Sequence, residues 1–337
     1  MPHNRIEKLR AAFGNVSSVL ILPHNDPDPD AIASALGLRY LLAQKFNLVA
    51  SVAYKGFIGR AENRALVGYL GNPLIRFRNS ILDEGVAVAL VDTQPGVGNH
   101  PLPERHSAAV VIDHHGLVPG TETAQYADVR PEIGSTSSIL TEYLIKAGVE
   151  PSKELATALF YGIKTDTMGL SRHANVVDIS AYFHLQPKID VKALGKIEQA
   201  QVPLTYFKSI DNAMHSGKIF DNDVLITYLG KLDYPDKCAE IADFMMRMQG
   251  ITWVFCMGVF RRELILSART ISEEMRAGKL VREIIKDKGT AGGHGAMAAG
   301  HIELTDGEDP GQVAAQLEAD ILLHLRGKAD IPSVPVI

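Results

Sequence analysis

The sequence predicts an α/β protein with a doubly wound, mainly parallel sheet domain, a smaller mixed α/β C-terminal domain, and the active cleft between them. Three observations lead to this prediction. Short apolar, β-branched runs alternate with helix-like stretches in the first half of the chain, and the second half has strand and helix signals of its own. The length of 337 residues allows two domains of ordinary size. We place the first domain at residues 1–187, a linker at 188–205 and the second domain at 206–337.

The first domain is expected to contain at least four strands and three helices. The strand candidates are apolar on both faces, which is typical of a parallel sheet covered on both sides. They lie at residues 18–22, 49–54, 86–91 and 109–112, and the helices are expected at 30–44, 134–147 and 152–165.

The second domain is expected to be mixed, because its strand and helix signals do not alternate regularly. Strands are expected at 223–229, 252–260 and 263–268, with Arg261 and Arg262 in a tight turn between the last two. Helices are expected at 236–249, 272–286 and 310–325, and residues 329–337 are expected to form a loose tail.

Composition limits the location and the partners. No apolar run approaches the ~20 residues of a membrane span, and the only cysteines, Cys238 and Cys256, do not have metal-binding spacing. We therefore expect a cytoplasmic protein that does not bind a membrane. The net charge of −5 argues against a groove for long nucleic acid, which would need a basic surface. A small phosphorylated ligand, held by a few cations and metals, fits better.

Four segments of acidic and histidine residues follow predicted strands or end a predicted helix. They are the segment 24–30 with His24, Asp28 and Asp30, then Asp92, then Asp113-His114-His115, then Asp166. In an open parallel sheet, ligands bind beyond the carboxyl ends of the strands, so these segments can converge. Carboxylates and imidazoles without thiolates favour Mn²⁺ or Mg²⁺, with Zn²⁺, Co²⁺ and Fe²⁺ as alternatives.

Each segment also has a purely structural interpretation. Asp30 can cap the helix that it opens, Asp92 can form a turn, and Asp166 can be a polar residue at a helix end. Crowded carboxylates, however, repel one another unless cations neutralise them. The four segments together therefore favour a metal site.

With these motifs the chain resembles the DHH phosphoesterase family, named for the triplet found here at Asp113-His114-His115. The resemblance implies two divalent cations, with Mn²⁺ expected and Mg²⁺ or Co²⁺ as alternatives. It implies one metal on His24 and Asp28, the other on Asp30, His114 and Asp166, and Asp92 bridging the two. It also implies that Asp113 orients a histidine and that His115 faces the substrate and stabilises its phosphate.

The C-terminal half resembles the DHH-associated domain. Gly292-Gly293-His294-Gly295 is similar to its Gly-Gly-His motif, and Ser267-Ala268-Arg269 to its Ser-x-Arg phosphate contact. The resemblance implies that Arg269, Gly292, Gly293 and His294 bind substrate, whereas a turn with an exposed histidine is the structural alternative. The alanine-rich residues 298–300 are expected to start a helix whose N-terminus attracts anions.

This combination resembles the nanoRNases and the 3′-phosphoadenosine 5′-phosphate phosphatases. It implies hydrolysis of short oligonucleotides (nanoRNA, linear dinucleotides) and/or 3′-phosphonucleotides by two-metal activation of water, in a monomer or a homodimer. Residues 168–173 depart from the pattern of the nanoRNases and leave the substrate preference open; Arg172 and His173 there are either phosphate contacts or surface residues. An exopolyphosphatase and a non-catalytic nucleotide-binding module are the alternatives.

Overall fold

The computed structural model describes residues 3–82 and 85–337, without the side chains of His3, Asn4, Glu273 and His294. The chain divides into two compact units, Met1–Ala200 and Gln201–Ile337. Each unit has its own sheet, so the expected two-domain α/β fold is confirmed.

Unit 1 is built on a parallel sheet in the order β3-β2-β1-β4-β5-β6. The strands are β1 (Ser18–Pro23), β2 (Val49–Tyr54), β3 (Leu74–Arg76), β4 (Val86–Val91), β5 (Val110–Asp113) and β6 (Tyr126–Val129). The chain runs outward from β1 to β3 and then returns to place β4 on the other side of β1. This reversal is the switch point at which α/β sheets bind ligands. The edge strands β3 and β6 were not predicted, because three or four residues of mixed polarity give no strand signal.

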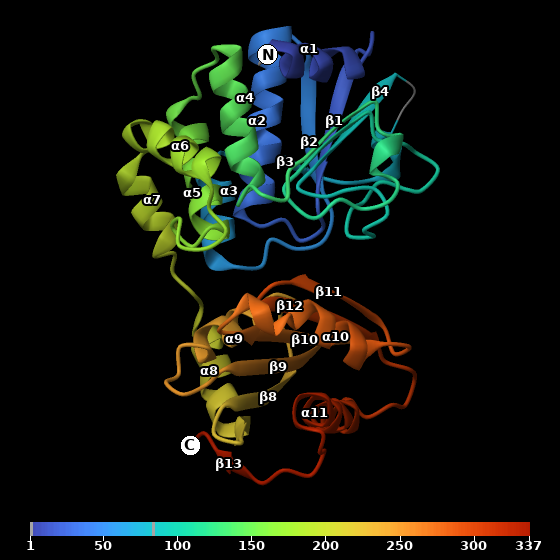
Figure 1. Cartoon of the computed structure of the whole chain (residues 1–337), viewed down its shortest axis with the longest axis vertical. Helices are drawn as coiled ribbons and strands as arrows, with labels where there is room; N and C mark the ends of the chain where they lie inside the picture. Colours follow the sequence, from blue (N-terminus) through green and yellow to red (C-terminus); the bar gives the residue numbers. More distant parts are fainter. Residues whose placement is uncertain (1–2, 83–84) are drawn as a thin grey trace. The chain divides into compact units, whose positions relative to one another are not determined.

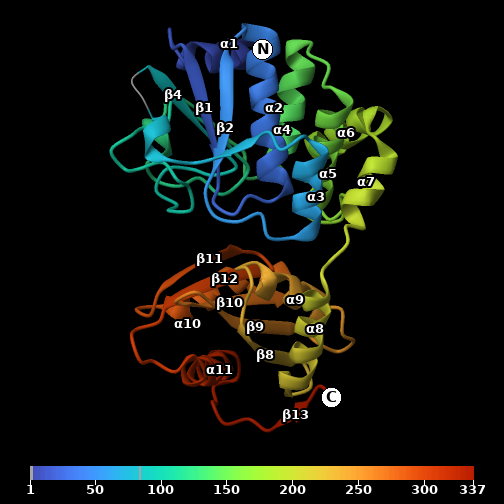
Figure 2. The ribbon, with the colours of Figure 1, turned by 180° about the vertical axis from the view of Figure 1, so that it is seen from behind.

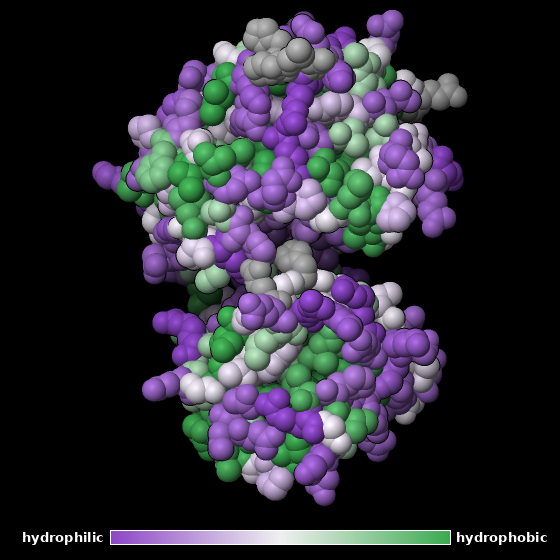
Figure 3. Space-filling model, in the orientation of Figure 1, coloured by the Kyte–Doolittle hydropathy of each residue, from purple (hydrophilic) through white to green (hydrophobic). Residues whose placement is uncertain are grey.

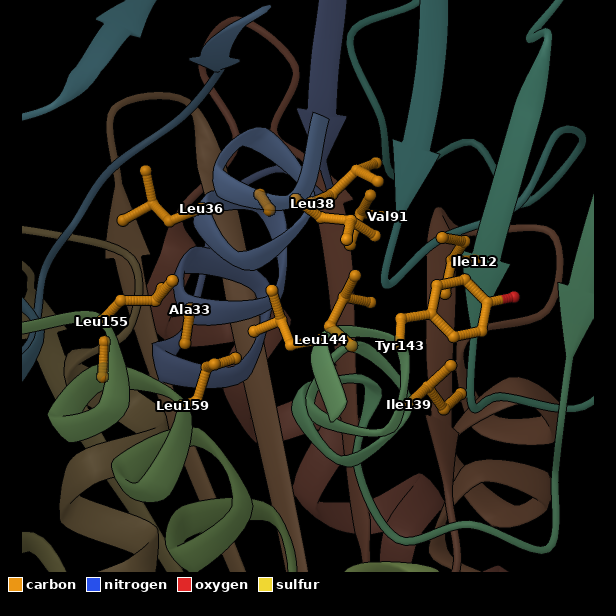
Figure 4. Close-up of a cluster of buried hydrophobic side chains, with 14 of the residues drawn as sticks. Ala33, Leu36, Leu38, Val91, Ile112, Ile139, Tyr143, Leu144, Leu155 and Leu159 are labelled. Atoms are coloured by element: carbon orange, nitrogen blue, oxygen red, sulfur yellow. The ribbon is translucent and has the colours of Figure 1, made fainter. Parts of the chain in front are cut away.

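Two helices, α2 (Pro29–Phe46) and α4 (Thr136–Ala147), pack against one face of this sheet (Figures 1 and 2). A third helix, α5 (Lys153–Asp166), packs against both of them. Their apolar side chains meet Val91 and Ile112 from the strands in one buried cluster (Figure 4). The opposite face is covered by side chains that include Leu102 and Ala108 of the β4–β5 connection.

The remaining helices of unit 1 lie around this core. They are α1 (His3–Ala12), α3 (Ala61–Tyr69), α6 (Val176–Leu185) and α7 (Val191–Glu198), with the short 3₁₀ helices η1 (Asn79–Ile81), η2 (Thr121–Thr123) and η3 (Gln186–Lys188). The helix α7 packs against α3 and α5, so residues 188–200 of the predicted linker 188–205 belong to unit 1.

Unit 2 has a mixed sheet in the order β11-β12-β10-β9-β8-β7-β13, in which only the β8–β9 pair is parallel. Its strands are β7 (Lys218–Phe220), β8 (Val224–Lys231), β9 (Trp253–Phe260), β10 (Glu263–Thr270), β11 (Thr290–His294), β12 (Met297–Glu303) and β13 (Ser333–Pro335). Its helices are α8 (Leu204–Ser216), α9 (Lys237–Met245), α10 (Ala277–Ile285) and α11 (Pro310–Arg326), with η4 (Glu273–Met275). Side chains of α8 and α9 join one apolar cluster at the sheet, and those of α10 and α11 join another.

Three predictions for unit 2 were wrong in detail. Residues 298–300 do not start a helix but lie in β12, where a Cβ on Gly300 would come within 2.7 Å of Ile285 of α10. The tail 329–337 is not wholly loose, because β13 pairs with β7 and covers its backbone edge. The helix expected at 272–286 is split at Arg276, which has the left-handed φ of 52°. The predicted Arg261-Arg262 hairpin is confirmed.

The exposed surface in the view of Figure 3 is mainly hydrophilic, with scattered hydrophobic patches on both units. None of the helices that the structure describes has both the length and the apolar character needed to cross a membrane.

Candidate active site

The sequence-predicted metal ligands of unit 1 lie at the switch point of its sheet. The loops that follow β1, β4 and β5 carry His24, Asp92 and His114, and these three strands are neighbours. The N-terminus of α2 adds Asp28 and Asp30, and the last residue of α5 is Asp166. The structure therefore brings together side chains from five separate elements, as the sequence predicted from the strand ends.

Asp92 is at the centre of this arrangement. Its carboxylate is buried, with Oδ2 lying 3.5 Å from His24 Nε2 and Oδ1 lying 3.5 Å from His114 Nε2. Thr136 Oγ1 donates a hydrogen bond of 2.8 Å to Oδ1. Asp92 has the left-handed φ of 60°, which is uncommon outside glycine and is typical of residues held in place for function. The two carboxylate oxygens thus face two different histidines.

The first group of converging atoms comes from His24, Asp28 and Asp92, with all the ligand atoms within 4.8 Å of one another. Burial disfavours the charged imidazole of His24, but the hydrogen bond to Asp28 and the charges of Asp28 and Asp92 outweigh burial and raise its pKa to about 10. Asp28 also caps α2, because Oδ1 accepts a hydrogen bond of 2.9 Å from Ala31 N. A group of side chains that attracts a proton this strongly is also suited to a metal cation.

The second group comes from Asp30, His114 and Asp166. Burial raises the pKa of both Asp30 and Asp166 well above the usual range, and the neighbouring carboxylates raise it further. Carboxylates gathered without a compensating charge are unfavourable, and a divalent cation would relieve the repulsion.

The hydrogen bonding of His114 indicates whether these residues are suited to bind a metal. Its Nδ1 lies 3.3 Å from the carbonyl oxygen of Ile133, and its Nε2 is buried without a hydrogen-bond partner among the residues that the structure describes. Burial also lowers the pKa of His114, which favours the neutral imidazole. A neutral imidazole with one nitrogen hydrogen-bonded and the other lacking a partner is the form in which histidine binds metals. The donor set therefore fits a hard or intermediate divalent cation such as Mn²⁺ or Mg²⁺.

Asp113 holds both histidines of the triplet. Its Oδ1 accepts hydrogen bonds of 2.8 Å from His115 Nδ1 and from the backbone N–H of His114, and its Oδ2 accepts one of 2.7 Å from Gln94 Nε2. Burial disfavours the charged form of Asp113, but the hydrogen bond and charge of His115 outweigh it and lower its pKa. Burial likewise disfavours the charged imidazole of His115, but the hydrogen bond to Asp113 and the charges of Asp92 and Asp113 outweigh burial and raise its pKa to about 9. At neutral pH, His115 is therefore a cation held by a buried carboxylate.

Four residues that support the site were not predicted to do so. The backbone N–H groups of Thr136 and Ser137 each donate a hydrogen bond of 2.7 Å to Asp30, so the N-terminus of α4 holds this carboxylate. Gln94 connects Asp113 to Thr121, whose Oγ1 donates to Gln94 Oε1 over 2.8 Å. The Gly-Ser-Thr sequence at 134–136 signals a helix start, but nothing local in the sequence indicates which carboxylate meets that helix.

In unit 2, Arg269 lies beside the glycine motif. Arg269 pairs with Met297 across β10 and β12, and Met297 pairs with His294 across β12 and β11, so the three lie in one row of the sheet. The Arg269 side chain is 11% exposed, and its Nε lies 2.5 Å from Asp243 Oδ1. The prediction for His294 concerns a side chain outside the described residues.

The two glycines of this motif differ. Gly293 has a φ of 135°, and a Cβ there would come within 2.4 Å of the Met297 carbonyl oxygen, so the hairpin itself requires glycine. A Cβ on Gly292 would meet nothing within 4 Å. The hairpin geometry therefore explains why residue 293 is glycine without any ligand. The packing does not explain why residue 292 is glycine.

Comparisons with known proteins cover the part of the chain that carries this site. A family model described as DHH family, N-terminal domain, matches residues 18–163, a range that includes every candidate metal ligand except Asp166. An uncharacterised protein of Methanocaldococcus jannaschii is 37% identical over 288 residues, which are 85% of this chain and 58% of that protein. A probable manganese-dependent inorganic pyrophosphatase of Streptococcus suis is 34% identical over 155 residues, 45% of this chain and 49% of that one. The chain thus spans about half the length of these curated relatives.

Among solved structures, an exopolyphosphatase-related protein from Bacteroides fragilis has a TM-score of 0.75. The alignment covers 95% of this chain and 96% of that one at 17% identity. At this identity the similarity shows a shared fold over both units.

Proposed function

On the premise that residues 18–163 form a DHH family N-terminal domain, we propose that the chain is a metal-dependent phosphoesterase. Its proposed substrates are short oligonucleotides, such as nanoRNA and linear dinucleotides, and/or 3′-phosphonucleotides. The proposed cofactors are two divalent cations, with Mn²⁺ expected.

The main support for this proposal is the geometry of Asp92. One buried carboxylate faces His24 with one oxygen and His114 with the other, at 3.5 Å each, and each histidine belongs to a separate group of ligands. This is the arrangement that a carboxylate shared by two metals requires. We assign His24 and Asp28 to one cation, Asp30, His114 and Asp166 to the other, and Asp92 to both. Two cations held by these residues would supply the activation of a water molecule and charge to balance the phosphoryl oxygens.

His115 is proposed to stabilise the charge that develops on the phosphoryl group. Asp113 holds His115 Nδ1, so the other ring nitrogen is the one that can donate to a phosphoryl oxygen. Despite the burial of His115, its hydrogen bond to Asp113 raises its pKa to about 9, which favours the protonated ring that carries this N–H. A preorganised donor of this kind is worth more in a partly buried site than in water. Asp113 is proposed to position His115 and not to react.

The proposed class of substrate follows from charge. The chain has a net charge of −5, which does not favour a long polyanion, and its pyrophosphatase relative is named for a small phosphate compound. The row formed by Arg269, Met297 and His294, next to Gly292, is proposed to bind a phosphate other than the one that reacts. For this role Arg269 would have to share its guanidinium between Asp243 and the ligand.

A substrate panel tests the proposal. The Mn²⁺-loaded protein would be incubated with a dinucleotide, an RNA 5-mer, 3′-phosphoadenosine 5′-phosphate, inorganic pyrophosphate and polyphosphate, and the products separated by chromatography. We expect turnover of a nucleotide substrate that is lost in Asp92→Asn, which preserves the shape of the side chain and removes its charge.

The other outcomes decide between the alternatives. If polyphosphate or pyrophosphate were hydrolysed and no nucleotide were, the substrates would be phosphoanhydrides instead of nucleotides. The proposed metal site would still stand. Nucleotide binding without turnover of any compound would indicate a binding module and would contradict the proposed activity.

A further inference from the structure

His24 is the ligand of the first metal group whose position depends on a loop. Asp28 accepts a hydrogen bond from the backbone of α2, and Asp92 accepts one from Thr136 of α4, so both carboxylates are fixed by helices. His24 lies just after β1, and its Nδ1 lies 2.7 Å from the carbonyl oxygen of Asn25. This contact directs the other ring nitrogen, Nε2, toward Asp28 and Asp92. The position of Asn25 therefore determines where His24 can bind a metal.

Asn25 is held by a neighbouring loop. Its backbone N–H donates a hydrogen bond of 2.5 Å to the carbonyl oxygen of Asn99. Asn99 belongs to the connection that follows β4, the strand next to β1 in the sheet. On the other side, Asp26 is tied to the connection that follows β2, since Asp26 Oδ1 accepts a hydrogen bond of 2.6 Å from Phe57 N. The loop that carries His24 is thus held between its two neighbours.

The side chain of Asn99 closes the segment after β4 on itself, and we call this segment, residues 93–99, the β4 turn. Thr93 Oγ1 donates a hydrogen bond of 2.5 Å to Asn99 Oδ1. Because Thr93 is buried, loss of this partner would leave its hydroxyl at a cost. The bond therefore determines where the carbonyl oxygen of Asn99 lies, and this oxygen is the acceptor for Asn25.

The same turn holds the DHH triplet on its other side. Gln94 Nε2 donates a hydrogen bond of 2.7 Å to Asp113 Oδ2, and Gln94 Oε1 accepts one of 3.0 Å from Val118 N. Gln94 thus contacts the loop after β5, whereas Asn99 contacts the loop after β1. Since β4 lies between β1 and β5, the β4 turn fixes the ligand-bearing loops of both neighbouring strands.

The second metal group is held in a different way. Asp30 accepts hydrogen bonds from the first backbone amides of α4, and His114 Nδ1 lies 3.3 Å from a carbonyl oxygen just before α4. Neither contact involves the β4 turn. Breaking the bond between Thr93 and Asn99 should therefore loosen His24 and leave the ligands of the second group in place.

We propose that Asn99 and Thr93 are positioning residues for one of the two metal sites, the site that contains His24. They act through Asn25, whose carbonyl oxygen orients the imidazole, and they do not bind the metal themselves. The inference rests on the proposed function, because it assumes a cation at the His24 group. It adds to the site two residues that lie outside its acidic and histidine motifs.

Calorimetric titration with Mn²⁺ tests the inference without turnover. Thr93→Val retains the shape of the side chain and removes the hydroxyl donor, whereas Asn99→Ala removes the acceptor. Each should weaken one of two Mn²⁺-binding events by about 10-fold or more, since groups that orient a metal ligand usually contribute about 10- to 100-fold to the affinity. Thr93→Ser keeps the hydroxyl and should bind both ions as the wild type does.

Two comparisons separate this role from general damage to the fold. Thr93→Val and Asn99→Ala break the same hydrogen bond, so the double variant should bind Mn²⁺ no more weakly than the weaker single variant. The event that they weaken should be the one that His24→Ala removes. The control is Thr305→Val in unit 2, because Thr305 Oγ1 also donates a hydrogen bond, of 3.0 Å to Glu308 Oε2, and its loss should change neither event.

Three results would overturn the inference: two unchanged binding events in Thr93→Val and Asn99→Ala, an equal loss of both events, or losses that add up in the double variant. A wild type that binds no Mn²⁺ would end the proposed function and this inference together. Two normal events in the wild type and in both single variants would end this inference alone.

Discussion

Gly162 of α5 provides a test of how closely the helices must approach at the candidate site. A Cβ on Gly162 would lie 2.5 Å from Ser137 Oγ, 3.1 Å from Asp30 Cα and 3.2 Å from Asp30 Oδ1. The Ser137 hydroxyl can rotate away, but the backbone of Asp30 can move only with α2. We therefore expect Gly162→Ala to displace the Asp30 carboxylate from the amides of α4 that hold it.

The magnitude follows from two opposing effects. Alanine is favoured over glycine inside a helix by about 1 kcal/mol, whereas overpacking a core costs about 1–3 kcal/mol. Gly195 of α7 is the matched control, since it also lies inside a helix but a Cβ there would meet nothing within 4 Å. Gly195→Ala should raise the free energy of unfolding by up to about 1 kcal/mol. Gly162→Ala should be about 1–3 kcal/mol less stable than this control, a difference of several degrees in Tm.

Urea unfolding of the two variants and of the wild type measures this difference, and Mn²⁺ titration measures its effect on the site. We expect weaker binding of Mn²⁺ only in Gly162→Ala, because Asp30 is one of the proposed ligands. If Gly162→Ala stabilised the protein as much as Gly195→Ala did and bound Mn²⁺ normally, the close approach of α5 to Asp30 would not constrain the site. The assignment of Asp30 as a ligand would then lose its structural support.

Three further predictions concern metals and substrate. Asp92→Ala should weaken two metal-binding events together and His24→Ala mainly one; calorimetry showing two unchanged sites in Asp92→Ala would refute a shared carboxylate. RNA of two to five nucleotides should be cut faster than long strands at physiological salt, because the chain has no net positive charge; equal rates on a 5-mer and a 50-mer would contradict this. Arg269→Ala should lower kcat/KM by about 10- to 100-fold on a dinucleotide but little on an activated aryl phosphate. An equal loss of kcat/KM on both substrates would mean that the ion pair of Arg269 with Asp243 stabilises the fold and that Arg269 does not bind substrate.

The strands of unit 1 were predictable because they are buried on both faces and leave continuous apolar runs. Residues 49–54 and 86–91 form strands with the predicted limits. The glycine-rich hairpin of unit 2 was not predictable in the same way. Alanine favours helices in isolation, but residues 297–303 are held as a strand between β10 and β11, and tertiary pairing outweighs local preference.

For the candidate site, the sequence by itself determined which residues are available and that they meet. His24, Asp92 and His114 each follow a buried strand, and the ends of adjacent parallel strands lie at one edge of the sheet. This geometry is a property of the sheet. The apolar pattern of each strand and the position of the residue that follows it are therefore sufficient to predict that these side chains meet.

Only the tertiary structure decided how these side chains are directed and what holds them. The two oxygens of Asp92 face different histidines because its backbone takes a left-handed angle and Thr136 fixes one oxygen. Asp30 is held by amides 106 and 107 residues away along the chain. Arg172 stands at Asp166 because the segment 167–173 packs against the start of α4. Such contacts depend on how whole helices pack, and neighbouring residues in the sequence carry no signal for them.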